Sequence, residues 1–246
     1  MSLELVILGI GSAFSARSWG SSAAVRHPSG FLLIDCPDPI FHVLADGASA
    51  SQWNLTPDTV TDILLTHLHG DHCNGLEALG FHRWLRHRKS TLPLPNLYTL
   101  PIVAARLWER LAPAMDRAGE GCLADYFRIC PLEPGQRALV GDLEVECRPA
   151  SHGIPATSWR MRRGNASLGW SGDTEFNRAL IDWLAEADLV IHETSAPPTH
   201  TGLPELDSLP KSIRRKMRLT HMPDDFDPNA TSLVPLRQGE VLVVGA

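Results

Sequence analysis

Apolar residues in this chain gather in short runs, and turn-forming residues separate one run from the next. Residues 3–9 form such a run, which contains a single charged side chain, Glu4. Runs of about four to eight apolar residues between turn signals are typical of buried β-strands. The same pattern predicts further strands at residues 60–66, 96–100, 189–192 and 241–244.

Pairs of apolar runs also flank short turn sequences, which is the arrangement of a β-hairpin. The turn sequences are His27-Pro28-Ser29, Gly141-Asp142 and Gly164-Asn165. The strands that they predict lie at residues 23–26 and 30–34, at 137–140 and 143–148, and at 159–162 and 167–170.

Helical spacing of apolar residues appears between these strands. Residues 75–88 carry Leu76 and Leu79 at helical intervals, and Pro101 suits the first turn of a helix that follows the strand at 96–100. Helices are predicted at residues 75–88, 101–111, 176–185 and 211–218, and residues 112–121 are predicted to be irregular. Because strands come in hairpins with helices between them, we expect an α/β fold with a mixed sheet and outer helices.

No linker rich in Gly, Ser or Pro divides the chain, so residues 1–246 are predicted to form one domain. Hydrophobic residues make up 43% of the sequence and charged residues 20%, a composition that argues against disorder. The net charge of −6 argues against attraction of the whole molecule to nucleic acid or to acidic membranes.

The cysteines and the first residues bear on the compartment. Five cysteines without CxxC spacing favour a reducing environment. The first apolar run lacks the basic region of a signal peptide, and no stretch reaches the roughly 20 apolar residues of a membrane span. We therefore expect a cytoplasmic protein with no membrane partner.

The segment that follows the strand at 60–66 concentrates metal-binding chemistry. His67, His69, Asp71 and His72 place four metal-competent side chains within six residues, which packing does not explain. Two histidines spaced by two at a strand end point to the same side, and Gly70 permits the turn that follows. Imidazole together with carboxylate suits zinc, with manganese or iron as alternatives.

This segment, His-x-His-x-Asp-His, resembles the signature of the metallo-β-lactamase superfamily of hydrolases. Five more segments resemble that superfamily and occur in its order. The first two are Leu8-Gly9-Ile10-Gly11-Ser12-Ala13 and Leu32-Leu33-Ile34-Asp35-Cys36. The other three are Ser151-His152-Gly153, Trp170-Ser171-Gly172-Asp173-Thr174 and Leu219-Thr220-His221.

The resemblance implies a four-layer αβ/βα sandwich, two mixed sheets flanked by helices, with two divalent metal ions at one edge. It implies that His67, His69 and His152 hold one metal ion. It implies that Asp71, His72 and His221 hold the second, and that Asp173 bridges the two. A water or hydroxide between the ions would be the nucleophile, and Asp71 is a catalytic candidate because it could orient that group.

Two neighbours of the motif have structural alternatives. Asp35 is predicted to be an outer partner that fixes the histidine loop, with a simple polar residue at a strand end as the alternative. Cys73 follows His72, but the position that bridges the metals is Asp173, so we expect a buried thiol and not a ligand.

Residues 189–194, with the sequence Leu-Val-Ile-His-Glu-Thr, and the loop with His200 resemble the ribonuclease Z and phosphodiesterase branch. In that branch the loop histidine is thought to protonate the leaving group, chemistry that suits imidazole. His200 is therefore the first candidate for this role and His192 the second, with structural roles as the alternatives.

The tRNA-binding arm of ribonuclease Z has no counterpart here, because Asp173 follows His152 by only 21 residues. This spacing favours a small phosphodiester, a cyclic nucleotide or a short RNA end over a whole tRNA. Arg160 and Arg162 lie within the interval and are predicted to bind substrate phosphate, since arginine forks suit phosphate oxygens.

Three functions remain open at this stage. The first is a phosphodiesterase with a metal-bridged hydroxide as nucleophile. The second is an acyl hydrolase of a thioester or lactone, which would not need His200. The third is a non-catalytic metal-binding accessory or sensor protein. Relatives of this branch are often dimers, so the resemblance also suggests a homodimer.

Overall fold

The computed structural model describes residues 2–90 and 92–245, and two seven-stranded sheets form its centre. The first sheet has the order β14-β1-β2-β3-β4-β5-β6. Neighbours from β14 to β3 are antiparallel, and those from β3 to β6 are parallel. Its strands are β1 (Leu3–Gly9), β2 (Ser22–His27), β3 (Gly30–Ile34), β4 (Val60–Leu64), β5 (Asn96–Thr99), β6 (Arg128–Pro131) and β14 (Val241–Val244).

The second sheet has the order β13-β12-β11-β10-β9-β8-β7. Neighbours from β13 to β10 are parallel, and those from β10 to β7 are antiparallel. Its strands are β7 (Arg137–Val140), β8 (Leu143–Ala150), β9 (Ala156–Arg163), β10 (Ala166–Trp170), β11 (Leu189–Glu193), β12 (Met217–Thr220) and β13 (Val234–Pro235). Both sheets are mixed, as predicted.

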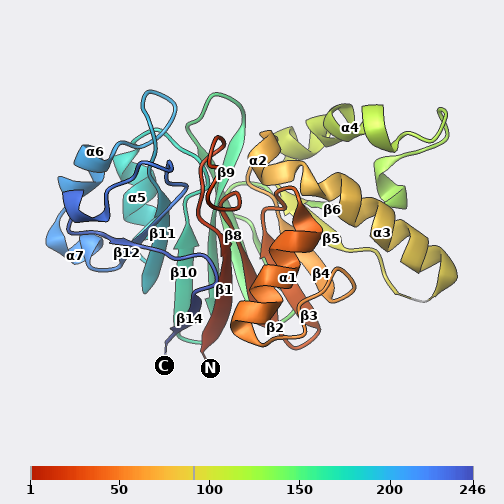
Figure 1. Ribbon diagram of the computed structural model, residues 1–246, viewed down its shortest axis with the longest axis horizontal. Coiled ribbons are helices and arrows are strands. Elements are labelled where there is room, and N and C mark those ends of the chain that lie inside the picture. Colours follow the sequence, from red (N-terminus) through yellow and green to blue (C-terminus); the bar gives the residue numbers. More distant parts are fainter. Residues whose placement is uncertain (1, 91, 246) are drawn as a thin grey trace.

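Helices cover the outer face of each sheet, so that four layers are stacked (Figure 1). The helices over the first sheet are α1 (Ile40–Ser51), α3 (Gly75–Lys89) and α4 (Pro101–Met115), and the one-turn α2 (Gly70–Cys73) directly precedes α3 in the chain. Those over the second sheet are α5 (Arg178–Leu184), α6 (Leu203–Asp207) and α7 (Lys211–Arg214). Among the described residues, no helix is both long enough and apolar enough to cross a bilayer.

The main core lies between the two sheets and under α1, α3 and α4. Leu5 and Ile7 of β1, Trp159 of β9 and Trp170 of β10 are all buried there. Full burial of one such side chain contributes roughly 1.5–3 kcal/mol. A smaller core lies between α5–α7 and the outer face of the second sheet. The predicted αβ/βα sandwich is confirmed.

Several elements were absent from the sequence prediction, among them the helix α1 and the strand β6. The helix α1 buries Ile40, Val43, Leu44 and Gly47 at helical intervals against the first sheet, a pattern that the sequence carries. The strand β6 is only four residues long and half-exposed, and it forms by parallel pairing with β5. Its pairing partner lies about 30 residues earlier, so local sequence does not reveal it.

Two predicted boundaries were wrong. The helix α4 continues to Met115 through Pro113, where an irregular segment was expected over 112–121, because buried Leu111 and Met115 anchor its last turn. The helix predicted at 211–218 ends at Arg214, and the strand β12 begins at Met217 and pairs with β11. The predicted single domain spans residues 1–246. Because residues 1, 91 and 246 lie outside the described residues, this domain assignment stays a prediction.

Candidate metal centre

The predicted metal ligands converge at one edge of the sandwich, where the carboxyl ends of several strands meet. His67 follows β4, His152 follows β8, Asp173 follows β10 and His221 follows β12. The strands β8, β10, β11 and β12 run in the same direction. Residues that follow them therefore reach the same edge although they are far apart in sequence, and β4 brings the histidine motif from the facing sheet.

The first group of side chains surrounds a point suited to one metal ion. His69 Nδ1 lies 3.0 Å from His67 Nε2 and 3.1 Å from His152 Nε2. Asp173 Oδ2 lies 3.6 Å from His67 Nε2. Ligand atoms around a tetrahedral zinc ion, with bonds of about 2.0–2.2 Å, are roughly 3.3 Å apart. The spacing of these four donors fits such an ion.

The second group lies beside the first and shares Asp173 with it. Asp71 Oδ2 lies 3.2 Å from His72 Nε2 and 3.2 Å from His221 Nε2. Asp173 Oδ1 lies 3.4 Å from His72 Nε2, while its Oδ2 faces the first group. Within each group the donor atoms lie within 4.8 Å of one another. The structure thus brings together all seven residues, and Asp173 stands where a bridging carboxylate would stand.

Outer partners orient the histidine rings of both groups. The Nδ1 of His67 donates to Thr66 Oγ1 at 2.9 Å, and the Nδ1 of His152 donates to the Thr199 carbonyl at 2.8 Å. Their Nε2 atoms are then unprotonated in the neutral rings and face the cluster. His72 Nε2 is buried without a hydrogen-bond partner among the described residues. A cation at the centre of the group would satisfy it, so the residues fit divalent metal ions.

Asp35 holds the histidine motif from below. It is fully buried, and its carboxylate accepts hydrogen bonds from the Thr66 N–H at 2.7 Å and from His72 Nδ1 at 2.8 Å. Burial raises the pKa of Asp35, and the His72 ring opposes that shift. The structure brings Asp35 to His72 as the sequence prediction requires. Its effect on metal binding stays a prediction.

The two carboxylates of the cluster are held in their charged form. Burial acts to raise the pKa of Asp173, but the His72 and His221 rings hold it well below its usual range. Burial likewise opposes ionisation of Asp71, and the adjacent His221 and His72 rings hold its pKa far below the usual value. Metal ligands must be deprotonated, and both carboxylates meet this condition.

His200 lies at the rim of the cluster, as the sequence prediction requires. Its Nδ1 is 2.9 Å from Glu193 Oε1, and its ring centroid is 5.0 Å from those of His152 and His221. Glu193 was not assigned a role from the sequence. It is buried at the end of β11, and its carboxylate also accepts a hydrogen bond from the Thr174 N–H at 2.8 Å. A glutamate at the end of an apolar strand was the signal that could have found it.

His192 does not belong to the cluster, and the prediction that it is catalytic is wrong. Neighbouring residues of a strand point to opposite faces, so His192 turns away from the face that Glu193 presents to the metal ligands. It is fully buried, and its Nδ1 donates to the Glu193 carbonyl. Burial lowers the pKa of His192 to about 4, so it is a neutral structural residue.

Arg160 and Arg162 also lie away from the cluster, and the prediction that they bind the substrate phosphate is wrong. Both are on β9 and are engaged with carboxylates. Arg160 forms ion pairs with Glu146 and Glu186 and lies over the Trp183 ring, beside α5. Arg162 pairs with Glu144. Alternation along β9 turns both guanidinium groups to the outer face of the second sheet.

Cys73 is buried in the main core, and no group of potential metal ligands within the described ranges contains a cysteine. The expectation that Cys73 is a buried thiol is confirmed. The interval between His152 and Asp173 is occupied by the hairpin of β9 and β10. No separate arm is present there, as predicted.

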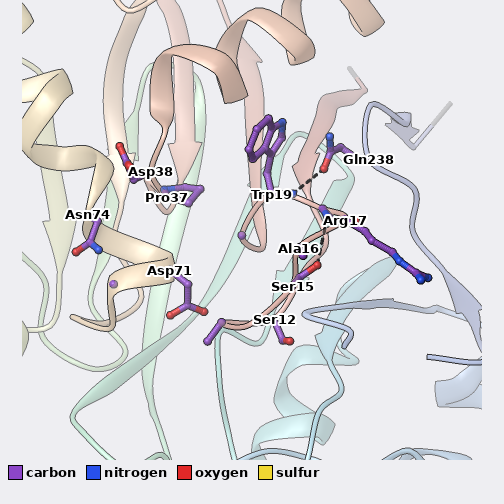
Figure 2. Close-up of a pocket in the computed structure, with 14 residues that line it drawn as sticks. Ser12, Ser15, Ala16, Arg17, Trp19, Pro37, Asp38, Asp71, Asn74 and Gln238 are labelled. Carbon is purple, nitrogen blue, oxygen red and sulfur yellow. Dashed lines mark hydrogen bonds between the residues drawn. The ribbon is translucent and has the colours of Figure 1, made fainter. Parts of the chain in front are cut away.

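A cavity of about 630 Å³ opens beside Asp71. Figure 2 shows Asp71 and Asn74 on one side of it and the loop with Ser12, Ser15 and Trp19 on the other. A second groove of about 430 Å³ lies beside His69, between α4 and the loop with Ile154. The metal ligands therefore lie between two hollows, of which the cavity beside Asp71 is the larger.

The model of one protein family, "Anti-Pycsar protein Apyc1", matches residues 3–241. The chain belongs to this family. An Anti-Pycsar protein Apyc1 from Paenibacillus sp. (strain J14) is 31% identical over 256 residues, which cover 98% of this chain and 99% of the relative.

Two further likenesses place the Apyc1 family among known proteins. A cAMP/cGMP-dependent 3′,5′-cAMP/cGMP phosphodiesterase B from Dictyostelium discoideum is 26% identical over 195 residues, 72% of this chain and 17% of that protein. The metallo-β-lactamase fold protein YhfI from Bacillus subtilis has a TM-score of 0.77 at 14% identity, covering 99% of this chain and 100% of YhfI. The latter shows that the fold is that of the metallo-β-lactamases.

Proposed function

We propose that this chain is a phosphodiesterase that hydrolyses 3′,5′-cyclic nucleotides with two divalent metal ions. The observation that carries the proposal is the pair of ligand groups joined by Asp173. A relative that is 26% identical over 195 residues is named as a cAMP/cGMP-dependent 3′,5′-cAMP/cGMP phosphodiesterase. Two bound cations would lower the pKa of a water molecule and offset the charge that develops on the phosphoryl oxygens.

The protein's own residues would hold the reacting groups in place. His67, His69 and His152 on one side, and His72 and His221 on the other, present ring nitrogens toward the shared Asp173. Asp71 approaches His72 and His221 through Oδ2, which leaves its Oδ1 to orient the attacking water. An attack in line with the leaving oxygen then opens the cyclic diester.

His200 is the candidate proton donor to that leaving oxygen. A ribose alkoxide is a strong base and needs a proton as the P–O bond breaks. Glu193 accepts a hydrogen bond from His200 Nδ1, which fixes the orientation of the ring. The donating atom would be Nε2. Glu193 does not reach the substrate in this account and acts as a positioning residue.

The size and charge of the site favour a mononucleotide over an RNA end. The cavity beside Asp71, at about 630 Å³, lies in the range of small-molecule sites. The described residues hold no arm for a folded RNA between His152 and Asp173. The net charge of −6 does not attract a polyanion, and Arg160 and Arg162 are paired with glutamates.

Three finer points belong to the same proposal. Zinc is the metal that best suits five imidazoles and two carboxylates at these spacings, with manganese or iron as alternatives. All five cysteines are free thiols, which supports a cytoplasmic location for the protein. A homodimer is the expected assembly, which light scattering coupled to size-exclusion chromatography would check.

The test uses metal-loaded protein with 3′,5′-cyclic nucleotides of the four common bases and with bis(p-nitrophenyl) phosphate. The parent protein should open at least one cyclic nucleotide to the nucleoside monophosphate. His200→Ala should lower that rate by about a hundredfold or more, since a general acid contributes this much. It should largely spare bis(p-nitrophenyl) phosphate, because p-nitrophenolate is a weak base and leaves without a proton.

A matched control is His42→Ala, since His42 is an exposed histidine on α1, and it should retain the parent rate on both substrates. Hydrolysis of a thioester or lactone, with no turnover of any phosphodiester, would replace the proposal with the acyl hydrolase. Bound metal without turnover of any of these substrates would leave the non-catalytic metal-binding protein as the better account.

A further inference from the structure

The loop of residues 12–20 forms one wall of the cavity beside Asp71 (Figure 2). The base of this loop is pressed against the metal-binding segment. A Cβ atom on Gly20 would lie 2.4 Å from the Asp71 carbonyl oxygen, so only glycine permits this approach. The position of the loop therefore sets how much room remains next to Asp71.

Backbone hydrogen bonds join the same loop to the segment that follows His221, a candidate metal ligand. The Ser12 N–H donates to the Met222 carbonyl at 3.0 Å, and the Met222 N–H donates to the Ile10 carbonyl at 2.8 Å. Across the loop, the Gly11 N–H donates to the Trp19 carbonyl at 2.9 Å. These backbone bonds fix the two ends of the loop but do not engage its tip.

The side chain of Asp224 holds the tip of the loop at residues 15–17, while Gln238 and Asp46 hold Trp19 nearer its end. The Asp224 carboxylate accepts hydrogen bonds from the Ser15 hydroxyl, from the Ala16 N–H at 2.8 Å and from the Arg17 N–H at 3.3 Å. The Ser15 hydroxyl and then the Ala16 N–H hold the pKa of Asp224 below its usual range, so the carboxylate is charged. An acidic side chain more than 200 residues away thus anchors the tip of the loop.

The cavity that this wall encloses suits a neutral group better than a second phosphate. Asp71 and Asp38 line it and would repel another anion. Arg17 also lines it, but its guanidinium is directed to the Asp224 carbonyl, away from Asp71 (Figure 2). The hydroxyl of Ser12 and the amides of Asn74 and Gln238 supply hydrogen-bonding groups for hydroxyl and base edges.

We propose that Asp224 is a positioning residue that fixes the loop 12–20 as the wall of a subsite for the sugar and base of the substrate. This inference rests on the proposed function, because it takes the phosphodiester to lie at the metal ligands. The subsite then begins at Asp71 and extends towards the loop tip. Asp224 contacts no substrate and acts through Ser15, Ala16 and Arg17.

The test compares Asp224→Ala with Asp225→Ala, which removes the neighbouring exposed carboxylate. Both are measured as metal-loaded protein for metal content, for bis(p-nitrophenyl) phosphate turnover, and for KM and kcat on the best 3′,5′-cyclic nucleotide. Asp224→Ala should raise KM for the cyclic nucleotide about tenfold, as expected when several hydrogen bonds that order a loop are lost. Metal content, kcat and turnover of the artificial diester should stay within about twofold of the parent.

Hydrogen exchange and a milder variant sharpen the test. In Asp224→Ala the amides of residues 15–18 should exchange faster while those of β1 and β12 keep their protection. Ser15→Ala removes only one of the bonds and should raise KM by less than Asp224→Ala. Asp225→Ala should match the parent in every measurement.

An unchanged KM in Asp224→Ala, together with faster exchange at the loop tip, would overturn the inference and leave the proposed function intact. Loss of metal and of both activities would also overturn it, because Asp224 would then act through His221. A parent protein that hydrolyses bis(p-nitrophenyl) phosphate but no cyclic nucleotide would instead remove the proposed function itself.

Discussion

The two sheets supply the metal centre in different ways. The first sheet delivers four candidate ligands from one short segment after β4, His67, His69, Asp71 and His72, with Asp35 directly beneath them. The second sheet delivers three ligands from three separate strand ends, at His152, Asp173 and His221. One half of the site can thus be recognised from a short stretch of sequence. The other half forms only when strands that are far apart in the chain pair with one another.

This difference extends to the outer partners. His67 and His72 of the first sheet are held by side chains that lie close to the motif in the same sheet, Thr66 and Asp35. His152 of the second sheet is held by the Thr199 carbonyl, from a loop 47 residues later. The loop that carries Thr199 also carries His200. The second half therefore couples metal ligation to the residue proposed to protonate the leaving group.

The largest expected effect comes from the residue that joins the two halves. Asp173→Ala removes donors from both groups at once, and it should lower kcat/KM by about a thousandfold or more and reduce the metal bound. Activity assays and elemental analysis on the same sample check this. Asp188→Ala, a carboxylate that bonds Ser167 at the far end of β10, is the control. Near-parent activity in Asp173→Ala would show that the two ligand groups do not need Asp173 to act as one site.

A smaller effect is expected from the partner beneath the first half. Asp35→Ala frees the His72 ring and should weaken metal binding about 10- to 100-fold, as loss of such partners does elsewhere. Competition with a chelator measures the affinity. Asp35→Asn, which keeps one acceptor oxygen, should fall between the parent and Asp35→Ala. Equal metal affinity in the parent, Asp35→Asn and Asp35→Ala proteins would show that the histidine motif binds metal without help from Asp35.

Glu193→Gln probes the corresponding position of the second half. The amide can still accept a hydrogen bond from His200 Nδ1, but it cannot carry the negative charge of a carboxylate. We expect kcat on the cyclic nucleotide to fall by about tenfold, with metal content unchanged. Turnover of bis(p-nitrophenyl) phosphate should change less. A loss of metal would mean that Glu193 supports His221 and not His200.

A weaker, pH-dependent effect is expected at the opposite end of the first sheet. Asp62 of β4 is bonded by Asn96 at 2.8 Å and lies 3.4 Å from His27 Nε2. Burial acts to raise its pKa, but hydrogen bonds from His27 and Asn96 leave the pKa below its usual range. A lowered folded-state pKa adds stability above the unfolded value of about 3.9, and that stability is lost as the pH falls through the folded value.

Thermal unfolding of the parent and of Asp62→Asn between neutral and acidic pH measures this contribution. The parent should be the more stable protein at neutral pH, and the difference should shrink as the pH falls below about 4. If the difference in stability between the two proteins did not depend on pH, the negative charge of Asp62 would contribute nothing to stability.

The smallest effect is expected on the outer face of the second sheet. Arg162→Ala removes an exposed ion pair with Glu144, and exposed pairs contribute at most about 1 kcal/mol. The KM for the cyclic nucleotide and the midpoint of thermal unfolding should both stay close to the parent values. A clear rise in KM would restore Arg162 as a substrate-binding residue.

The contrast between the halves also explains what the sequence could predict. The motif from His67 to His72 is local, so its spacing alone indicated a metal site. The strand β6 and the placement of Arg160 depend on pairing and on which face of a strand looks outward, and short sequence patterns do not give either. His192 and Glu193 are neighbours in one strand, and only its register decides which of them reaches the metal ligands.

The helix α1 is a different case, because its apolar spacing at Ile40, Val43 and Leu44 was present in the sequence. The segment follows Pro37 and Pro39, and no element was predicted for it. Asp224 could not have been identified from sequence at all. Its partners Ser15 and Ala16 lie at the other end of the chain, and the contact exists only because β1 and β12 end at the same edge.

The central claim is that the two halves form one centre that works with two metal ions. Zinc titrated into metal-free protein, with bound metal and cyclic-nucleotide hydrolysis followed together, tests it most directly. We expect hydrolysis to appear as about two ions bind per chain, and we expect Asp173→Ala to abolish it. Full hydrolysis at one ion per chain, or none with two ions bound, would contradict it.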